Sequence, residues 1–306
     1  MPKELFGKDY EFLAGDRLLS FDEIARITGC FAEAGTAKVR LTGGEPLLRR
    51  DLEDLIRSLR AIPGVEDLTL TTNGTLLARK AESLAAAGLD RVTVSLDSLD
   101  DDNFTRMNDV GFPVARVLGA IDAASEAGLT PLKINAVIKK GVNDHEVVDL
   151  ARRFKGTGHI IRFIEFMDVG TTNGWRLDDV MPAAEIVERI DAAMALEPVE
   201  PNYPGEVAGR FRYRDGSGEI GVVASVSAPF CGSCTRVRLS AEGSLFTCLF
   251  AAKGHDLRDL LRSGATDEEL DQAIQRIWKS RADRYSEIRS EDTEGWERVE
   301  MSYIGG

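Results

Sequence analysis

The sequence predicts a barrel-like α/β domain followed by a smaller cap. Over about the first 170 residues, short β-branched runs alternate with longer amphipathic stretches, which is the pattern of a parallel sheet with helical crossovers. Runs such as residues 92–96 are apolar enough to be strands buried on both faces. After about Gly170 the alternation gives way to hairpin and helix patterns. We therefore expect two domains, residues 1–170 and 171–306.

Each element of the first part has its own signal. Strands are predicted where β-branched and apolar residues run together, at residues 37–41, 67–72, 91–96, 132–138 and 159–166. Helices are predicted where apolar residues recur at helical spacing, at residues 52–62, 78–87, 115–127 and 144–154. Gly88 and Gly128 follow the second and third of these helices, where a glycine favours a helix stop.

The second part opens with a helix from Pro182, a good first helical residue, to Ala195. Residues 211–223 are predicted to form a hairpin about a glycine-rich turn, and residues 235–250 a second hairpin that turns at residues 241–243. Helices follow at residues 256–262 and 267–280. We expect this cap to bring three cysteines to one end of the barrel.

Composition and charge limit the classes of protein to which the chain can belong. A chain of 306 residues with 43% hydrophobic content can bury a large core. Its 51 acidic and 38 basic residues give a net charge of -13, which disfavours non-specific binding to nucleic acid. We see no signal segment and no apolar run long enough to cross a bilayer, so we expect a cytoplasmic protein without a membrane partner. An anionic ligand must then be held by local basic residues.

Three of the four cysteines form the most informative motif. They are spaced C-x2-C-x13-C and are Cys231, Cys234 and Cys248. Three thiolates can hold three irons of a cubane cluster and leave the fourth iron open to a ligand, and the nearby Arg236 and Arg238 suit phosphate. His255 could instead complete a zinc site, and buried unliganded thiols are a third alternative. The fourth cysteine, Cys30, is isolated and is expected to be a buried thiol without a role.

Small and polar residues follow three of the predicted strands. They occupy residues 42–46, 71–75 and 95–98. Because ligands of parallel sheets sit at the carboxyl ends of the strands, these segments should lie together. Two adjacent glycines in the first segment would let a ligand approach the backbone closely. Each segment alone is a common loop entry, but as a set they outline a polar pocket.

Together these segments resemble a known family, the GTP 3',8-cyclases, which are radical S-adenosylmethionine enzymes that open molybdenum cofactor biosynthesis. The similar segments are T-G-G-E-P (42–46), L-T-T-N-G (70–74), V-S-L-D (94–97), R-F-I-E-F-M (162–167), F-C-G-S-C-T-R-V-R-L (230–239) and Y-I-G-G (303–306). The likeness runs from Met1 to Gly306. It implies an incomplete TIM-type barrel with a smaller α+β cap that carries a second cluster. It also implies cyclisation of GTP to (8S)-3',8-cyclo-7,8-dihydroguanosine 5'-triphosphate.

The resemblance implies a role for particular residues, none of them as a catalytic acid or base. It implies contacts to S-adenosylmethionine for Gly43, Gly44, Glu45, Pro46, Ser95 and Met167. It implies contacts to GTP for Arg40, Thr71, Lys133, Arg236, the backbone at Val237, and Arg238. It implies that the three clustered cysteines, Cys231, Cys234 and Cys248, hold a [4Fe-4S] cluster whose open iron binds the purine, and that Gly305 and Gly306 reach the active site. Without the resemblance, Arg40 could equally face solvent or pair with Glu66 or Asp67, and Met167 could be core packing.

The family's first [4Fe-4S] cluster is expected to be missing from this chain. In the family it is bound by three cysteines spaced C-x3-C-x2-C, which precede Met-Pro and a phenylalanine-rich loop. Residues 1–10 look like that loop. We therefore expect a start codon assigned too far downstream, or a fragment of a longer native protein. As given, the chain could not generate the radical unaided.

The resemblance also implies partners, and two other functions stay open. The implied partners are GTP, an electron donor, a second copy in a homodimer, and the pterin-forming enzyme that acts next, with no nucleic acid and no membrane. One alternative is another radical S-adenosylmethionine enzyme with an auxiliary cluster. The other is a non-catalytic protein that binds a metal or a nucleotide.

Overall fold

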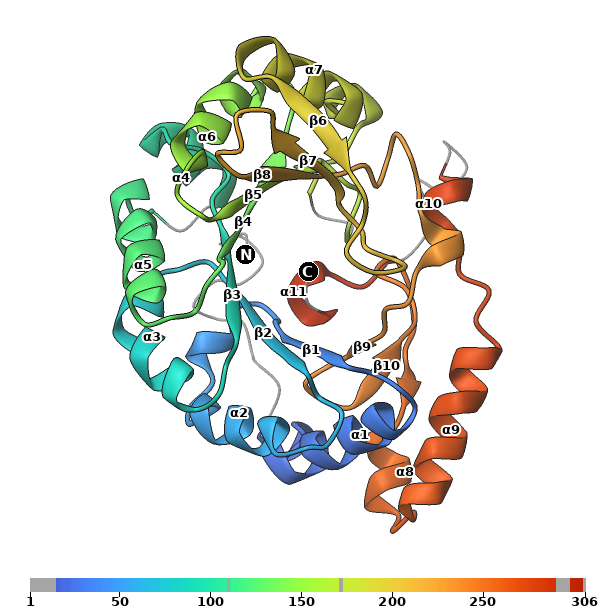
Figure 1. Ribbon diagram of the computed structural model, residues 1–306. Helices are drawn as coiled ribbons and strands as arrows, with labels where there is room; N and C mark the ends of the chain where they lie inside the picture. Colours follow the sequence, from blue (N-terminus) through green and yellow to red (C-terminus); the bar gives the residue numbers. More distant parts are fainter. Residues whose placement is uncertain (1–14, 109–110, 171–172, 290–297, 305–306) are drawn as a thin grey trace.

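The protein is built around one curved eight-stranded sheet. The computed structural model describes residues 15–108, 111–170, 173–289 and 298–304 (Figure 1). The strands lie in the order β1-β2-β3-β4-β5-β8-β7-β6. The first six in this order run parallel, and β7 and β6 continue the sheet antiparallel. The sheet curls into an open ring with helices outside it (Figure 1), so the predicted partial barrel is confirmed.

The strands and helices have the following bounds. The sheet contains β1 (Lys38–Leu41), β2 (Asp67–Thr72), β3 (Arg91–Ser95), β4 (Lys133–Ile138), β5 (Ile160–Glu165), β6 (Leu196–Val199), β7 (Gly209–Tyr213) and β8 (Glu219–Val223). A smaller sheet contains β9 (Arg238–Leu239), β10 (Ser244–Phe246) and β11 (His255–Asp256). The helices are α1 (Phe21–Glu33), α2 (Leu52–Arg60), α3 (Leu77–Ala86), α4 (Asp101–Asn108), α5 (Val114–Glu126), α6 (Val147–Phe154), α7 (Ala183–Ala193), α8 (Arg258–Arg262), α9 (Asp267–Lys279), α10 (Tyr285–Ile288) and α11 (Met301–Ile304).

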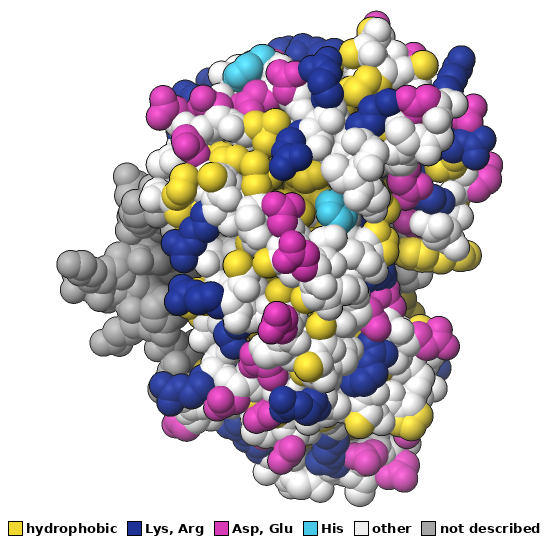
Figure 2. All heavy atoms as spheres, turned by 60° about the vertical axis from the view of Figure 1, so that its left-hand side comes forward, with side chains coloured by type: hydrophobic (Ala, Val, Ile, Leu, Met, Phe, Trp, Pro, Cys, Tyr) yellow, Lys and Arg dark blue, Asp and Glu magenta, His cyan; other side chains and the backbone are white. Residues whose placement is uncertain are grey.

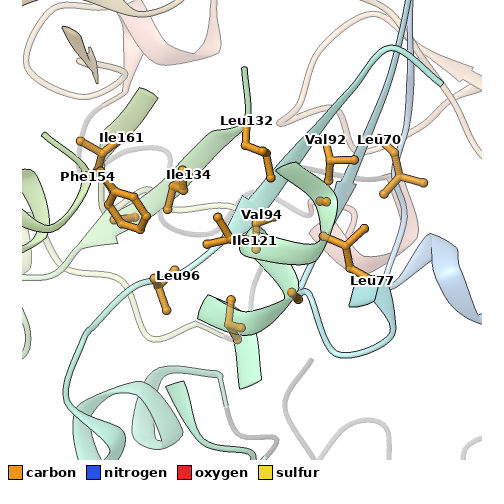
Figure 3. Packing of buried hydrophobic residues seen from close by; sticks show 14 of the residues in the cluster. Leu70, Leu77, Val92, Val94, Leu96, Ile121, Leu132, Ile134, Phe154 and Ile161 are labelled. Carbon is orange, nitrogen blue, oxygen red and sulfur yellow. The ribbon is translucent and has the colours of Figure 1, made fainter. Parts of the chain in front are cut away.

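The main core lies between the outer face of the sheet and the helices. Leu70 of β2, Val94 of β3 and Ile134 of β4 are fully buried there. Figure 3 shows them with Leu77 of α3 and Ile121 of α5 in one packed layer. Because side chains alternate along a strand, burying these residues on the outer face turns their neighbours into the ring. Packing of the helices therefore decides which side chains line the interior.

A second core joins the cap, by which we now mean the chain from Cys231 to the end of α10, to the beginning of the described chain. Ile27 and Cys30 of α1 pack with Leu245 of β10 and with Leu270 and Ile274 of α9. Cys30 is thus a buried core thiol, as expected. The cap fills the side of the ring where the sheet does not close (Figure 1).

The sheet extends past the expected domain boundary. Strands β6, β7 and β8 follow residue 170 but belong to the eight-stranded sheet, and Ile220 and Val222 belong to its core. The division at residue 170 stays a prediction. None of the described helices is long and apolar enough to cross a membrane.

Candidate active site

The inner face of the ring is polar and rich in cations. Residues such as Leu68 and Leu70 of β2 lie in the core, so the residues between them face inward. The inward side chains are Lys38 and Arg40 of β1, Asp67, Thr69 and Thr71 of β2, Arg91, Thr93 and Ser95 of β3, Lys133 and Asn135 of β4, and Arg162 of β5. We call this set the lumen face. Five of its members are cations, whereas Asp67 is its one acid.

The single carboxylate of the lumen face is shared by two cations. Asp67 lies 2.9 Å from Nζ of Lys38 and also pairs with Arg91. Burial opposes ionisation of Asp67, but the hydrogen bonds from Arg91 and Lys38 outweigh burial and lower its pKa. The pair of cations also ties β1, β2 and β3 together on the inside.

Three other cations of the lumen face form no salt bridge with a carboxylate among the described residues: Arg40, Lys133 and Arg162. Burial and the charge of Arg162 lower the pKa of Lys133 to about 8. Burial and the charge of Arg40 lower the pKa of Arg162 to about 9. Burial also lowers the pKa of Arg40. The charge of Glu206, in the loop before β7, opposes part of the lowering of the pKa of Lys133 and of Arg162. The excess positive charge makes the interior a site for an anion.

The strand register fixes where Arg162 points. Arg162 pairs with Asn135 across β5 and β4 and donates from Nε to Asn135 Oδ1 at 2.9 Å. On its other side it pairs with Gly221 of β8. A Cβ at Gly221 would lie 3.0 Å from Cγ of Arg162, so the glycine leaves room for the arginine.

The cap adds two guanidinium groups to this interior. Burial lowers the pKa of Arg238 to about 10, and the positive charges of Arg236 and Arg40 act in the same direction. The charge of Arg236 also adds to the effect of burial in lowering the pKa of Arg40. Nε of Arg236 is buried and has no hydrogen-bond acceptor, while its guanidinium lies 5.3 Å from the ring centroid of Phe230. The side chain of Val237 packs against the second core. These arginines therefore converge with Arg40 from a separate part of the chain.

Thr71 carries a buried hydroxyl without a partner. Its Oγ1 is inaccessible to water and forms no hydrogen bond. Because buried polar atoms are nearly always satisfied, an unpaired hydroxyl on the lumen face indicates a place for a ligand group.

Glu45 fixes the glycine loop to the end of β2. Its carboxylate accepts hydrogen bonds from Thr72 Oγ1 (2.8 Å), Asn73 N (2.8 Å) and Leu47 N (3.0 Å). Burial raises its pKa, although these hydrogen bonds oppose the change. Gly43 has a φ of +133° and a Cβ there would meet no described atom within 4 Å, so the loop needs a glycine and leaves open space beside it. Pro46 is buried at the start of the following 3-10 turn.

The ends of β3 and β4 are also tied to one another. Asp97, two residues beyond Ser95, accepts a hydrogen bond from Val137 N at 2.8 Å, and burial raises its pKa to about 6. Asn143 donates to the carbonyl oxygens of Asp97 (2.6 Å) and Val137 (2.8 Å). These contacts hold Ser95 at the carboxyl edge of the sheet.

The exit of β5 lies against the segment that carries the third clustered cysteine. Met167 and Cys248 both pack against a small core of Val169, Phe250 and Tyr285. Residues expected to meet S-adenosylmethionine and residues expected to hold a cluster are therefore neighbours.

The three clustered thiols meet in one region. Burial raises the pKa of Cys248, and the charge of Cys231 contributes to this rise. Both Cys234 and Cys248 are near enough to Arg238 to interact with its charge. Burial also opposes ionisation of Cys234, but the charge and hydrogen bonds of Arg236, with help from Arg281, lower its pKa to about 7. The surroundings of Cys234 thus favour a thiolate, the form that binds metal.

Backbone and guanidinium donors surround two of the three clustered thiols. Among the described residues, no three His, Cys, Asp or Glu side chains are placed to hold one metal ion. His255 is exposed on β11. A cubane instead spreads its thiolates over different irons. Arg236 Nη2 and Phe250 N donate to the sulfurs of Cys234 (3.3 Å) and Cys248 (3.4 Å), as donors around such clusters do.

The structure shows further polar residues beside those that the sequence analysis expected at the site. The sequence analysis missed Lys38, Arg91, Asn135 and Arg162. Arg40 and Lys133 were predicted from the family resemblance, whereas the alternation of these four residues with apolar residues along the predicted strands is the signal that could have found them. Gly305 and Gly306 lie outside the described residues.

Comparison with known proteins identifies the family. Residues 7–154 match the Radical SAM superfamily, and residues 159–287 match Molybdenum Cofactor Synthesis C. Relatives named GTP 3',8-cyclase from Acidothermus cellulolyticus, Xanthomonas axonopodis pv. citri and Staphylococcus aureus are 54%, 51% and 46% identical over 100% of this chain and 91% of their own length. This chain belongs to the GTP 3',8-cyclase family. Radical SAM proteins of this kind use S-adenosylmethionine and an iron–sulfur cluster.

A solved structure agrees with this cyclase-family chain in fold. It is native anSMEcpe with bound AdoMet and Cp18Cys peptide, with a TM-score of 0.50 and 14% identity over 81% of this chain and 72% of that chain. At this identity the likeness concerns the fold alone.

Proposed function

We propose that the protein is a GTP 3',8-cyclase that converts GTP to (8S)-3',8-cyclo-7,8-dihydroguanosine 5'-triphosphate at the start of molybdenum cofactor biosynthesis. One observation carries the proposal beyond family membership. Cations of the barrel wall and of the cap converge on one interior beside the clustered cysteines. This arrangement suits a ligand with a highly charged end and a base that reaches a cluster.

The triphosphate would lie against the lumen face. Arg40, Lys133 and Arg162 have no carboxylate partner among the described residues, and each would regain a favourable environment when an anion enters. Guanidinium groups bind phosphate in a planar, bidentate manner. Thr71 would supply its unpaired hydroxyl.

The cofactors would lie at the carboxyl edge and in the cap. Cys231, Cys234 and Cys248 would hold a [4Fe-4S] cluster. S-adenosylmethionine would bind along Gly43, Gly44, Glu45, Pro46, Ser95 and Met167. When bound, these groups supply the one-electron chemistry that the side chains of the protein lack. The chain's own residues bind the phosphates, orient the ribose and the base, and exclude water from the interior.

The remaining partners follow from the same proposal. An electron donor would serve the clusters, and a pterin-forming enzyme would take the product. We further propose a cytoplasmic homodimer in which Gly305 and Gly306 reach the site.

The cluster assignment is tested by metal analysis of the 306-residue chain after anaerobic reconstitution. We expect about four irons and four sulfides per chain, as for one cubane cluster. Cys248→Ser should lose most of the iron, because it removes one of three ligands. Cys30→Ser is the matched control and should keep it, because Cys30 packs in the second core. One zinc per chain and no iron–sulfur absorption would contradict the assignment.

The activity is tested on the chain extended by the upstream cysteine segment expected above. Anaerobic incubation with GTP, S-adenosylmethionine and dithionite should yield 5'-deoxyadenosine and the cyclised nucleotide. Arg238→Ala should bind GTP at least about tenfold more weakly, as for loss of a charged phosphate contact. Formation of 5'-deoxyadenosine without the cyclised nucleotide would point to a different substrate.

A further inference from the structure

Asp168 is a buried carboxylate with no role in the function proposed above. Its side chain is 4% exposed. It accepts hydrogen bonds from the hydroxyl of Tyr285 and from Arg289 Nε, the latter at 2.8 Å. Arg298 Nη1 lies 3.2 Å from Asp168 Oδ2 and donates to the Asp168 carbonyl oxygen at 2.7 Å. The side chains of Arg289 and Arg298 are 7% and 8% exposed.

This carboxylate joins three parts of the molecule. Asp168 stands one residue after Met167, where the chain leaves β5. Tyr285 belongs to α10, and Glu287 of the same helix accepts from the backbone of Gly232, between two clustered cysteines, at 3.2 Å. Arg298 begins the last described stretch of the chain, residues 298–304, which we call the tail segment. The exit of β5, the cysteine segment and the tail segment therefore share one buried charge.

The tail segment lies inside the ring of strands. Figure 1 shows α11 within the ring rather than among the outer helices. Ile304 is 3% exposed, and Tyr303 donates to Glu242 and meets the ring of Phe246 edge-on at 6.2 Å. Glu300 packs so closely on Gly170 that a Cβ there would overlap its carboxyl group. A helix of one turn is not stable by itself, so these contacts must hold α11 in place.

We propose that Asp168 and Arg298 anchor the tail segment inside the barrel, which makes Asp168 a positioning residue for the candidate active site. A buried ion pair that loses one member leaves the other charge without compensation. Nη2 of Arg289 is already buried without an acceptor, so neutralising the carboxylate would leave this guanidinium with still less compensation for its charge. The anchor itself does not depend on the proposed function, whereas its effect on turnover does.

Hydrogen exchange on the 306-residue chain tests the anchor directly. The amides of Val299, Tyr303 and Ile304 donate to backbone carbonyl groups and report on the tail segment. We expect Arg298→Gln and Asp168→Asn each to speed exchange there by roughly 100-fold. Exchange in β2, β3 and β4 should stay as in the parent. Arg298→Lys keeps the charge but loses the fork of donors, so its effect should be smaller.

A matched control separates the anchor from loss of any ion pair. Arg212→Gln removes an arginine that pairs with Glu197 on the exposed hairpin of β6 and β7, and it should leave the tail segment protected. Unchanged exchange of the tail segment in Arg298→Gln would overturn the proposal. Equal acceleration throughout the protein would also overturn it, because it would mean that the cluster stabilises the whole fold. Arg298→Gln suffices if Asp168→Asn does not fold.

Turnover, measured on the extended chain described under the proposed function, gives a second, independent test. Arg298→Gln should lower kcat more than it raises KM for GTP, since it displaces a wall of the site and leaves the lumen cations intact. In a chain that lacks residues 301–306 the same substitution should have no further effect. A further loss in that background would overturn the anchor. Absence of turnover in the parent would instead reject the proposed function, with the exchange result still standing.

Discussion

Lys133 is a charged side chain in surroundings that disfavour its charge. Burial and the neighbouring charge of Arg162 lower its pKa to about 8, against about 10.4 for a free lysine. At pH values between these two pKa values, Lys133 binds a proton less often in the folded protein than in the unfolded chain. The contribution of Lys133 to the stability of the unliganded protein therefore rises with pH across this window. Binding of an anion has the opposite pH dependence and weakens as the pH rises, because the anion binds the protonated amine of Lys133.

We predict that GTP affinity falls as pH rises through about 8. For one titrating group the dissociation constant should increase up to about tenfold per pH unit above the pKa. Calorimetric titration of the chain with GTP between pH 7 and pH 9.5 (about the range that brackets this pKa) measures the effect. Lys133→Arg should move the step to higher pH, because a guanidinium keeps its proton to a higher pH than an amine in the same surroundings. A step that stays at the same pH in Lys133→Arg would assign the titration to another group.

Asp67 controls how much positive charge the interior offers. It neutralises part of the charge of Lys38 and Arg91. Because its pKa is lowered, its stabilising contribution is present above the pKa of an unfolded aspartate and is lost as the pH falls through the folded-state pKa.

We predict that Asp67→Asn tightens GTP binding several-fold and costs about 1–2 kcal/mol of the free energy of unfolding. The first change arises because two cations are released toward the ligand, and the second because the clamp on three strands is lost. Calorimetry and urea unfolding measure the two effects. The control is Asp215→Asn, which removes the partner of Lys155 at an exposed turn. Equal affinity in Asp67→Asn and the parent would contradict the charge argument.

Single residues of the site were predictable where a motif or a strand period identified them. The glycine loop is one short motif, and two of the clustered cysteines and the arginines that follow them form another; the structure has the first at the carboxyl edge and the second in the cap. Arg162 was predictable in principle, since it alternates with the core residues Ile161 and Phe163. Asp168 was not, because its partners Tyr285, Arg289 and Arg298 are more than 100 positions away and no local pattern marks them.

At the scale of elements, the long periodic segments were predicted well. The strand predicted at residues 67–72 coincides with β2, and the hairpin predicted at 211–223 is formed by β7 and β8. Helix α1 was missed although Ser20 and Glu23 form a capping box at its start. Short elements such as β6 and β11 carry too few residues for a period, and they form because neighbouring strands pair with them.

The start of α9 provides a prediction at this scale. Thr266 accepts from Glu269 N, and Glu269 accepts from Thr266 N at 2.8 Å. This helix packs against α1 through Leu270 and Ile274. Thr266→Ala should therefore lower the free energy of unfolding by about 1 kcal/mol, as measured by urea unfolding. Thr266→Ser keeps the hydroxyl and should cost much less, whereas equal losses in both variants would show that the cap is not responsible.

At the scale of the whole molecule, the outer surface and the interior of the ring differ in charge. Figure 2 shows Lys and Arg side chains interspersed with Asp and Glu over one outer face. The interior instead concentrates cations, although the net charge of the chain is -13. Composition alone could give the net charge but not this separation, which depends on the alternation of side chains about the curved sheet.

The continuity of the sheet leads to a prediction about the two expected domains. A fragment of residues 1–170 would end after β5 and expose the edge that β8 normally covers. It would also lack Ile220 and Val222 of the main core. We expect this fragment to bind a hydrophobic dye and to unfold without cooperativity, because an uncovered apolar edge aggregates. Residues 1–229, which restore β6, β7 and β8, should fold better. Cooperative unfolding of the shorter fragment would support the division at residue 170.

The place of the tail segment has a consequence for biosynthesis. A nascent chain leaves the ribosome from its amino end, so residues 298–304 emerge after all the other residues described here. Until then, the interior of the ring of strands contains neither α11 nor the guanidinium of Arg298. Cofactors would thus meet a roomier interior during translation than afterwards.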